Sequence, residues 1–365
     1  MGLRRIGNLN MTGNHLPLIK LGGSSYEIGY LHGKEGKEGI KDFLDQVILH
    51  GKEFSPGLTK AKAVSQVRLY LPFIEAYALH LTEEIKGIAD GANIPVEEAY
   101  LLQMRAELTQ LTLEEADGCT SFALPKSKTE DNKVWVGQNL DLSPFYKHFG
   151  VMLHITPEKG PAILCYSQIG SLAHAGINSA GIGWAANALF SSGWKPGVPR
   201  PVLYRLLLEK EDLSAALRVV TNAKRASSCN YLIAHASGEI KNLEAIPDHY
   251  GIVDSRGDLF VHANHFTHPE MVPFEKRPKD KLENSKFREN RLRELITQDD
   301  GKISIDRLKI FLADHQLHPT AVCTHPEGNP WNVATIASII AKPADRLMHV
   351  SMGPGCANEY VTYTL

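Results

Sequence analysis

The sequence predicts an α+β fold from two contrasting halves and the boundary between them. The first 118 residues carry mainly the apolar spacing of amphipathic helices, whereas residues 119–365 are rich in segments with the alternating pattern of strands. The change falls at the pair Gly118-Cys119, where the acidic, helix-like segment LTLEEAD gives way to CTSFALP. With 365 residues, 43% of them hydrophobic, the chain is long enough for one large domain or two medium ones.

The half before this boundary is predicted to be one short strand followed by helices. Ser24 and Glu27 fit a capping box that opens a helix, and Gly29 and Gly33 lie four residues apart within it, a small pair that permits close packing. The helical region 59–89 is interrupted near Pro72. The strand and the two later helical regions are expected at residues 16–21, 59–89 and 94–111.

The half after the boundary is predicted to be strand-rich, with three helical insertions. The expected strands are 119–125, 133–142, 151–156, 162–169, 181–189, 230–236, 239–246, 258–266 and a closing pair within 333–352. The expected helices are 202–220, 283–296 and 304–315. The strands between 230 and 266 resemble a meander, and the Lys-, Arg- and Glu-rich run 275–293 is interpreted as a solvated helical face.

Composition excludes several classes of function. The formal net charge is −2 with both signs interspersed, so neither nucleic acid nor a membrane surface is an expected partner. No apolar run approaches the length of a membrane helix, and we expect a cytoplasmic protein. The cysteines are odd in number, widely spaced and without a CxxC motif, which argues against a disulfide framework and a thiolate zinc site. We therefore expect free thiols, no metal and no cofactor.

Cys119 is the residue with the strongest chemical implication. A small buried hydrophobe is the ordinary role of a cysteine, and a strand beginning at Cys119 has no helix dipole to stabilise a thiolate. A base would arise if Cys119 attacked the Gly118 carbonyl and cut the chain, because a free α-amine titrates at about 7.7–8.0 and could take the thiol proton. Glycine before the cysteine suits this chemistry, since it tolerates an unusual backbone conformation.

Several motifs occur in the order found in one known family: SYEIGYLHG, DGCTS, GQNLD, INSAGIG with ANAL, HANHF and a closing GPGCANEY. On these motifs the chain resembles the acyl-coenzyme A:isopenicillin-N acyltransferase family, whose members are self-processing N-terminal-nucleophile cysteine enzymes. The resemblance implies a four-layer αββα sandwich, and we expect its helices to lie outside two stacked antiparallel sheets. It also implies cleavage between Gly118 and Cys119, which would leave an α-chain of residues 1–118 associated with a β-chain of residues 119–365, a heterodimer made from one precursor.

The resemblance assigns roles to individual residues. Cys119 would be the nucleophile, and Asp141 in GQNLD would position the new α-amine; an ordinary strand-end aspartate is the alternative. Asn264 in HANHF would direct its side-chain N–H at the oxyanion, unless it is only a buried structural amide. Asn187 in WAANAL falls near a second oxyanion or substrate contact, in an uncertain register.

The sequence departs from the family at one position. The penicillin-forming enzymes have an arginine before the last pair of strands, where this chain has Asn332, flanked by Trp331. A guanidinium that would grip a carboxylate is thus replaced by a neutral amide, so the leaving amine is expected to be tolerated without a carboxylate. Trp184 and Trp331 are candidate walls of the substrate pocket.

The function expected from these residues is hydrolysis of a small N-acyl amide or amino-acid amide through a Cys119 acyl-enzyme. Acyl-CoA-dependent N-acyl transfer is the alternative; it ranks second because coenzyme A favours a cationic cradle and the basic run Lys276–Arg293 is interpreted as solvated. A non-catalytic binding protein on the same fold is another alternative.

Two further enzyme classes compete for the same motifs. A papain-like protease would use His262 or His265 as its base, but the strand context of Cys119 argues against it. A metal hydrolase would use the histidines that recur every third residue. These are His262, His265 and His268, with His315 and His318 repeating the spacing. A three-residue step sends successive strand side chains to opposite faces, and no HExxH motif is present.

Overall fold

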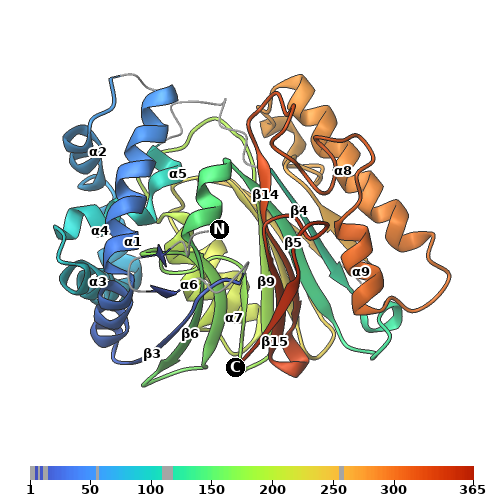
Figure 1. Cartoon of the computed structure of the whole chain (residues 1–365), viewed down its shortest axis with the longest axis horizontal. Helices are drawn as coiled ribbons and strands as arrows, with labels where there is room; N and C mark the ends of the chain where they lie inside the picture. The colour runs from blue at the N-terminus through green and yellow to red at the C-terminus, as the bar shows by residue number, and fades with distance from the viewer. Residues whose placement is uncertain (1–4, 7–8, 11–14, 55–56, 109–117, 255–258) are drawn as a thin grey trace.

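Two stacked β-sheets with helices on both outer faces make up the protein (Figure 1). The computed structural model describes residues 5–6, 9–10, 15–54, 57–108, 118–254 and 259–365. The predicted four-layer αββα arrangement is confirmed. The predicted helix-like segment LTLEEAD and the end of the helix expected at 94–111 lie outside the described residues.

The first sheet has eight strands in the order β12-β11-β10-β9-β8-β7-β6-β3. Their bounds are β3 Leu18–Gly23, β6 Gly150–Pro157, β7 Ile163–Gln168, β8 Gly176–Asn178, β9 Ile182–Ala188, β10 Cys229–His235, β11 Ile240–Ala245 and β12 Tyr250–Asp254. The expectation of purely antiparallel sheets is wrong at one edge, where β3 pairs parallel with β6. More than a hundred residues separate these strands, so no tight turn fixes their relative direction.

The second sheet has six strands in the order β13-β4-β5-β14-β15-β16. Their bounds are β4 Gly118–Leu124, β5 Trp135–Leu142, β13 Phe260–His262, β14 Ala334–Lys342, β15 Leu347–Met352 and β16 Tyr360–Thr364. The predicted meander is wrong at its last strand, because β13 leaves the first sheet and pairs with β4. A further strand, β16, follows the predicted closing pair and forms the far edge. A separate two-stranded ribbon joins β1 Arg5–Ile6 and β2 Leu9–Asn10.

Helices from the first part of the chain cover the outer face of the eight-stranded sheet (Figure 1). They are α1 Ser25–Phe54, α2 Lys60–Val67, α3 Leu71–Ala92, α4 Val96–Gln103 and α5 Arg105–Leu108. The capping box is present, with the Ser24 backbone N–H donating to Glu27 Oε2 at 2.8 Å. The predicted close packing is also present: a Cβ on Gly29 would lie 1.9 Å from the Glu84 backbone oxygen, so α1 meets α3 at backbone contact.

Four later helices complete the two outer layers: α6 Arg200–Leu208, α7 Leu213–Thr221, α8 Lys279–Thr297 and α9 Ile305–Leu312. The helix predicted at 202–220 is two helices, because the Asp212 side chain accepts the Ala215 backbone N–H and caps α7. Helices α8 and α9 lie against the six-stranded sheet, with a core that includes Phe122, Trp135 and Leu292 (Figure 1). Within the described ranges, no helix has the length and apolar character needed to cross a bilayer.

Candidate active site

Gly118 and Cys119 are the first residues of β4, and their pairing with β5 places them on opposite faces of the six-stranded sheet. Gly118 is opposite Asp141, and Cys119 is opposite Leu140. Side chains alternate along a strand, so Cys119 and Leu140 face the other sheet, whereas Gly118 and Asp141 face helix α8. The Gly118–Cys119 peptide bond therefore lies between two cavities, one on each face of the sheet.

The first cavity lies between the sheets and contains the Cys119 side chain. It is partly open to solvent. The Cys119 side chain itself is 3% exposed, and Gln138 Nε2 lies 3.9 Å from its sulfur. The cavity lining is apolar near the sheets and polar toward the helices, where it includes Arg105, Glu107, His174, Arg200 and Tyr204. Burial lowers the pKa of His174 to about 3, so this imidazole is neutral at physiological pH.

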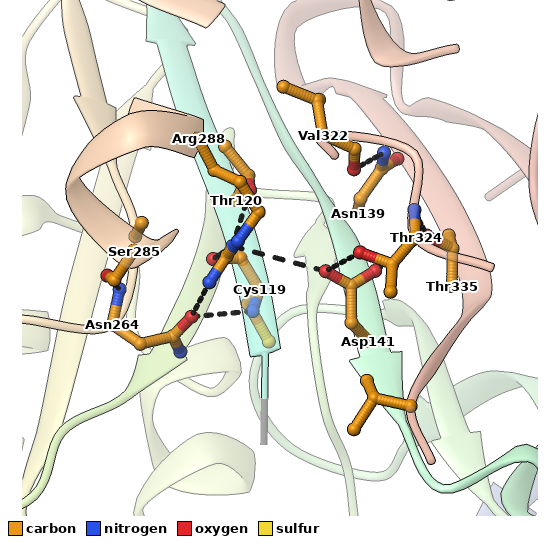
Figure 2. Close-up of polar contacts among 12 residues, drawn as sticks. Cys119, Thr120, Asn139, Asp141, Asn264, Ser285, Arg288, Val322, Thr324 and Thr335 are labelled. Atoms are coloured by element: carbon orange, nitrogen blue, oxygen red, sulfur yellow. Dashed lines mark hydrogen bonds and ion pairs between the residues drawn. The ribbon is translucent and has the colours of Figure 1, made fainter. Parts of the chain in front are cut away.

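The backbone of Cys119 is held by three side chains, and Figure 2 shows two of them, Asn264 and Arg288. Its N–H donates to Asn264 Oδ1 at 2.8 Å. Its carbonyl oxygen accepts from Arg288 Nη1 at 2.8 Å and from Asn187 Nδ2 at 3.3 Å. The nitrogen that cleavage would convert into an α-amine therefore already has a fixed partner.

Arg288 is the centre of the polar network, and the sequence analysis did not identify it. This residue of α8 is 3% exposed and donates to Thr120 Oγ1 at 2.7 Å, Asn264 Oδ1 at 2.8 Å and Asn284 Oδ1 at 3.0 Å, besides Cys119. Figure 2 shows the guanidinium between the Cys119 strand and Asn264, with Asp141 on its other side. Burial lowers the pKa of Arg288, and this effect outweighs the interactions with Asp141 and Cys119, which raise it.

The interpretation of residues 275–293 as a solvated face is therefore wrong for one side of α8. The buried residues of the helix follow the spacing of a single stripe: Lys281, Asn284, Ser285, Arg288, Leu292 and Ile296. This spacing is visible in the sequence, but most of the stripe is polar, so it does not register as an apolar periodicity. A polar side chain in line with Leu292 and Ile296 is the signal that would have identified Arg288.

Asp141 lies on β5, next to Gly118, and is 1% exposed. Its Oδ1 accepts from Thr335 Oγ1 at 2.6 Å, its Oδ2 accepts from Thr324 Oγ1 at 3.3 Å, and Arg288 Nη1 lies 4.0 Å from Oδ2. Burial raises the pKa of Asp141, against the attraction of Arg288 and the two hydroxyl donors. A Cβ on residue 118 would lie 3.1 Å from the Asp141 Cβ, so a larger residue here would require Asp141 to shift by a few tenths of an ångström.

Asn264 follows β13 and is fully buried. Its Oδ1 accepts from both Cys119 N–H and Arg288, which fixes the orientation of the amide. Its Nδ2 donates to the Ala188 carbonyl at 3.1 Å. An amide nitrogen has two N–H groups, and the second is the group that the predicted oxyanion role requires.

The four residues predicted to bind substrate do not lie together. Asn187 is buried and holds the Cys119 carbonyl. Trp184 is packed against Tyr204, behind the wall of the first cavity. Trp331 lines a second cavity on the α8 side of the sheet, with Gly118 and Asp141. Asn332 is exposed and lies outside the lining of both cavities.

The second cavity also changes the interpretation of Asn332. Its lining includes Arg277, Lys281 and Arg288, so cations lie beside Gly118 and Asp141 although position 332 holds a neutral amide. The absence of an arginine at 332 therefore gives no information on whether the leaving amine carries a carboxylate.

The two histidines that a papain-like enzyme would use are engaged with other partners. His262 contacts the Ala263 carbonyl through Nδ1 at 2.8 Å and Glu244 through Nε2 at 2.9 Å. Burial alone would lower the pKa of His262, but the hydrogen bond to Glu244 and its charge raise it above the usual value. His265 contacts Ser285 Oγ through Nδ1 at 2.9 Å, and burial lowers its pKa to about 3. This pairing argues against either ring as the base for Cys119.

Comparisons with known proteins agree with the resemblance. The pattern of the family described as acyl-coenzyme A:6-aminopenicillanic acid acyl-transferase matches residues 127–355. The acyl-coenzyme A:6-aminopenicillanic-acid-acyltransferase 40 kDa form of Emericella nidulans is 28% identical over 339 residues, which cover 91% of each chain.

Two solved structures also match the chain at low sequence identity. Penicillin V acylase from Agrobacterium tumefaciens is 12% identical with a TM-score of 0.44, covering 64% of this chain and 83% of its own. Conjugated bile acid hydrolase from Clostridium perfringens is 13% identical with a TM-score of 0.48, covering 68% of this chain and 97% of its own.

Proposed function

The chain belongs to the acyl-coenzyme A:6-aminopenicillanic acid acyl-transferase family, and we propose that it is a self-processing cysteine amidohydrolase that cleaves small N-acyl amides. One observation carries the proposal. The Cys119 N–H is bonded to Asn264 in a buried polar network, while the Cys119 side chain lines a separate cavity that opens to solvent between the sheets. A thiol and its prospective amine base are thus positioned by different groups around one residue.

Maturation would begin with an N-to-S acyl shift. The Cys119 sulfur adds to the Gly118 carbonyl carbon, the C–N bond breaks as the C–S bond forms, and the thiol proton ends on the nitrogen. Water then hydrolyses the thioester, giving a Gly118 carboxylate, the free thiol and the α-amine of Cys119. Residues 1–118 and 119–365 would stay associated, because α1–α5 remain packed on the eight-stranded sheet.

The new α-amine is the proposed general base. An α-amine titrates at about 7.7–8.0, so a substantial fraction is neutral at physiological pH and can accept the thiol proton. Asn264 Oδ1 already accepts a hydrogen bond from this nitrogen, and the Asp141 carboxylate lies beside Gly118 on the adjacent strand. Together they would orient the amine toward the sulfur.

Turnover follows from this arrangement in two steps. The thiolate attacks the substrate carbonyl, the second N–H of Asn264 stabilises the oxyanion, and the amine returns its proton to the leaving nitrogen. Water, activated by the same amine, then hydrolyses the thioester. The acyl group is assigned to the first cavity, where Leu140, Ala186 and Ala188 form the apolar part of the wall.

Transfer of the acyl group from or to coenzyme A is the second candidate, and the buried cations favour it more than the sequence indicated. Arg277, Lys281 and Arg288 line the second cavity. Arg288, however, is committed to the Cys119 network, and the Arg277 guanidinium lies 4.4 Å from the Phe190 ring centroid. Because these two cations already have partners within the protein, we rank hydrolysis ahead of acyl transfer with coenzyme A.

Intact-mass measurement of the purified protein tests the proposal. We expect a fragment that begins at Cys119, and a single uncut chain for Cys119→Ala. Cleavage at the same bond in Cys119→Ala would contradict self-processing by this thiol. A panel of N-acyl amides, assayed with and without acyl-CoA, then separates the two activities: release of free acid without acyl-CoA supports hydrolysis, whereas product that appears only with acyl-CoA supports transfer.

A further inference from the structure

The loop between α9 and β14 meets the turn between β15 and β16 at a cluster of two cysteines and two histidines. The residues are His315, Cys323, His325 and Cys356, and one possible ligand atom from each lies within 4.8 Å of the other three. We propose that these four side chains bind one divalent metal ion in tetrahedral geometry, with Zn²⁺ the best match.

The distances within the cluster fit such a site. The two sulfurs are 3.5 Å apart, and His325 Nε2 lies 3.5 Å from the Cys323 sulfur, 3.4 Å from the Cys356 sulfur and 3.0 Å from His315 Nε2. A regular tetrahedron with ordinary Zn–S and Zn–N bonds has edges of about 3.3 to 3.8 Å. Four of the six separations are thus close to these edges, and the remaining two, from His315 to the sulfurs, are within 4.8 Å.

The donor set selects the kind of metal. Two thiolates and two neutral imidazoles are typical ligands of structural zinc, and they balance the ion's charge without a further anion. Calcium and magnesium, which prefer oxygen donors, are disfavoured. Binding would release the two thiol protons and fill all four positions, which describes a structural site rather than one that activates water.

The sequence analysis predicted no metal, because the cysteines are far apart in the chain and lack a CxxC motif. Cys323 and Cys356 are 33 positions apart, and only the packing of the two loops brings their sulfurs together. The three-residue spacing in the sequence pairs His315 with His318, and no sequence pattern links His315 to either cysteine. The metal would cross-link two loops, one between α9 and β14 and one between β15 and β16.

The position of the cluster suggests what the metal holds in place. Thr324 lies between two of the proposed ligands, and its hydroxyl donates to Asp141 Oδ2. Its backbone N–H donates to Thr335 Oγ1 at 3.0 Å, and that hydroxyl donates to Asp141 Oδ1. The metal would therefore fix the loop that positions Asp141; this link to catalysis rests on the proposed function, whereas metal binding itself does not.

The test begins with the full-length chain prepared under reducing conditions and loaded with Zn²⁺ or Co²⁺. We expect one metal ion per chain, and for cobalt a tetrahedral d–d spectrum with thiolate charge-transfer absorption. The double variant Cys323→Ser/Cys356→Ser should lose both the bound metal and the charge-transfer band. Cys119→Ala and His318→Gln are the matched controls, one removing a thiol and one a histidine from the same loop, and both should keep the metal.

A second measurement does not depend on the variants folding. In the wild-type chain, Zn²⁺ should protect the exposed Cys356 from a thiol reagent, and a chelator should restore its labelling, as followed by peptide mapping. Equal labelling of Cys356 with and without zinc would overturn the proposal, as would metal retained in the double variant or a Cys323–Cys356 disulfide that persists under reduction. Because Cys119→Ala binds metal without being cut, failure of self-processing and failure of metal binding are read out separately.

Discussion

Replacing Arg288 by methionine tests whether the buried network around Cys119 is held by one guanidinium. The change preserves the bulk of the side chain and removes its charge and its donors. Of the four acceptors, the Cys119 carbonyl keeps Asn187 and Asn264 Oδ1 keeps the Cys119 N–H. Thr120 and Asn284 lose the donor that Arg288 supplies.

The magnitude follows from these losses. Leaving two buried acceptors unsatisfied costs about 1–3 kcal/mol each, or roughly 2–6 kcal/mol in total. A second way to estimate the cost is to treat Arg288 and the buried carboxylate of Asp141 as an ion pair, and breaking a buried pair typically costs about 3–5 kcal/mol. The two ranges overlap and describe the same loss, so they are not added. We therefore expect Arg288→Met to lower the free energy of unfolding by about 4 kcal/mol.

The assay needs one covalent state, so the substitution is made in the Cys119→Ala background, in which every chain is expected to stay uncut. The free energy of unfolding is measured by urea titration. Lys286→Met, an exposed cation on the same helix, is the matched control and should change it by less than about 0.5 kcal/mol. In the Cys119 background, Arg288→Met should also slow the appearance of the fragment that begins at Cys119. Equal stabilities of the two variants would refute the network as described.

Three further predictions concern Asn264, Asp141 and His32. Asn264→Asp keeps an acceptor for the Cys119 N–H but removes the amide donors, so turnover per processed chain should fall by about 10²–10³; unchanged turnover would remove Asn264 from the oxyanion site. Asp141→Asn removes a negative charge beside the amine, which should lower the amine pKa and shift the acidic limb of kcat/KM to lower pH; a limb that does not move would contradict this role. Burial lowers the pKa of His32 to about 4, and its Nε2 accepts the Gly170 N–H. Because the unfolded state then binds more protons below about pH 6.5, His32 destabilises the fold as the pH falls, and His32→Gln should reduce the loss of unfolding free energy between pH 7 and 4.5 by about 2–3 kcal/mol. An equal loss in both proteins would show that another group governs acid stability.

Local features of the site could be predicted because they depend on neighbours in the chain. The capping box at Ser24 and the close approach at Gly29 are properties of short segments and are confirmed. The alternation of CTSFALP predicts the strand β4 from Cys119, one residue after its observed start at Gly118. That alternation also places Gly118 and Cys119 on opposite faces, whichever strand pairs with them.

Long-range features could not be predicted in the same way. The position of β13 beside β4, and the parallel edge formed by β3, depend on which sheet edge a strand reaches after a long connection. The role of Arg288 could not be predicted for a related reason. A charged residue in a charged run becomes a buried hydrogen-bond centre only when its helix packs over β4.

The sequence by itself determined the two kinds of secondary structure on either side of Gly118-Cys119, since these follow from short-range periodicity, and through the resemblance to a known family it singled out Cys119 as the proposed nucleophile. Only the tertiary structure decided what surrounds Cys119. The Asn264 contact with the Cys119 nitrogen, the Arg288 network and the meeting of Cys323 with Cys356 all join residues distant in the chain. Such contacts are fixed by the packing of layers and loops, and packing depends on the shape of the whole core rather than on any local pattern.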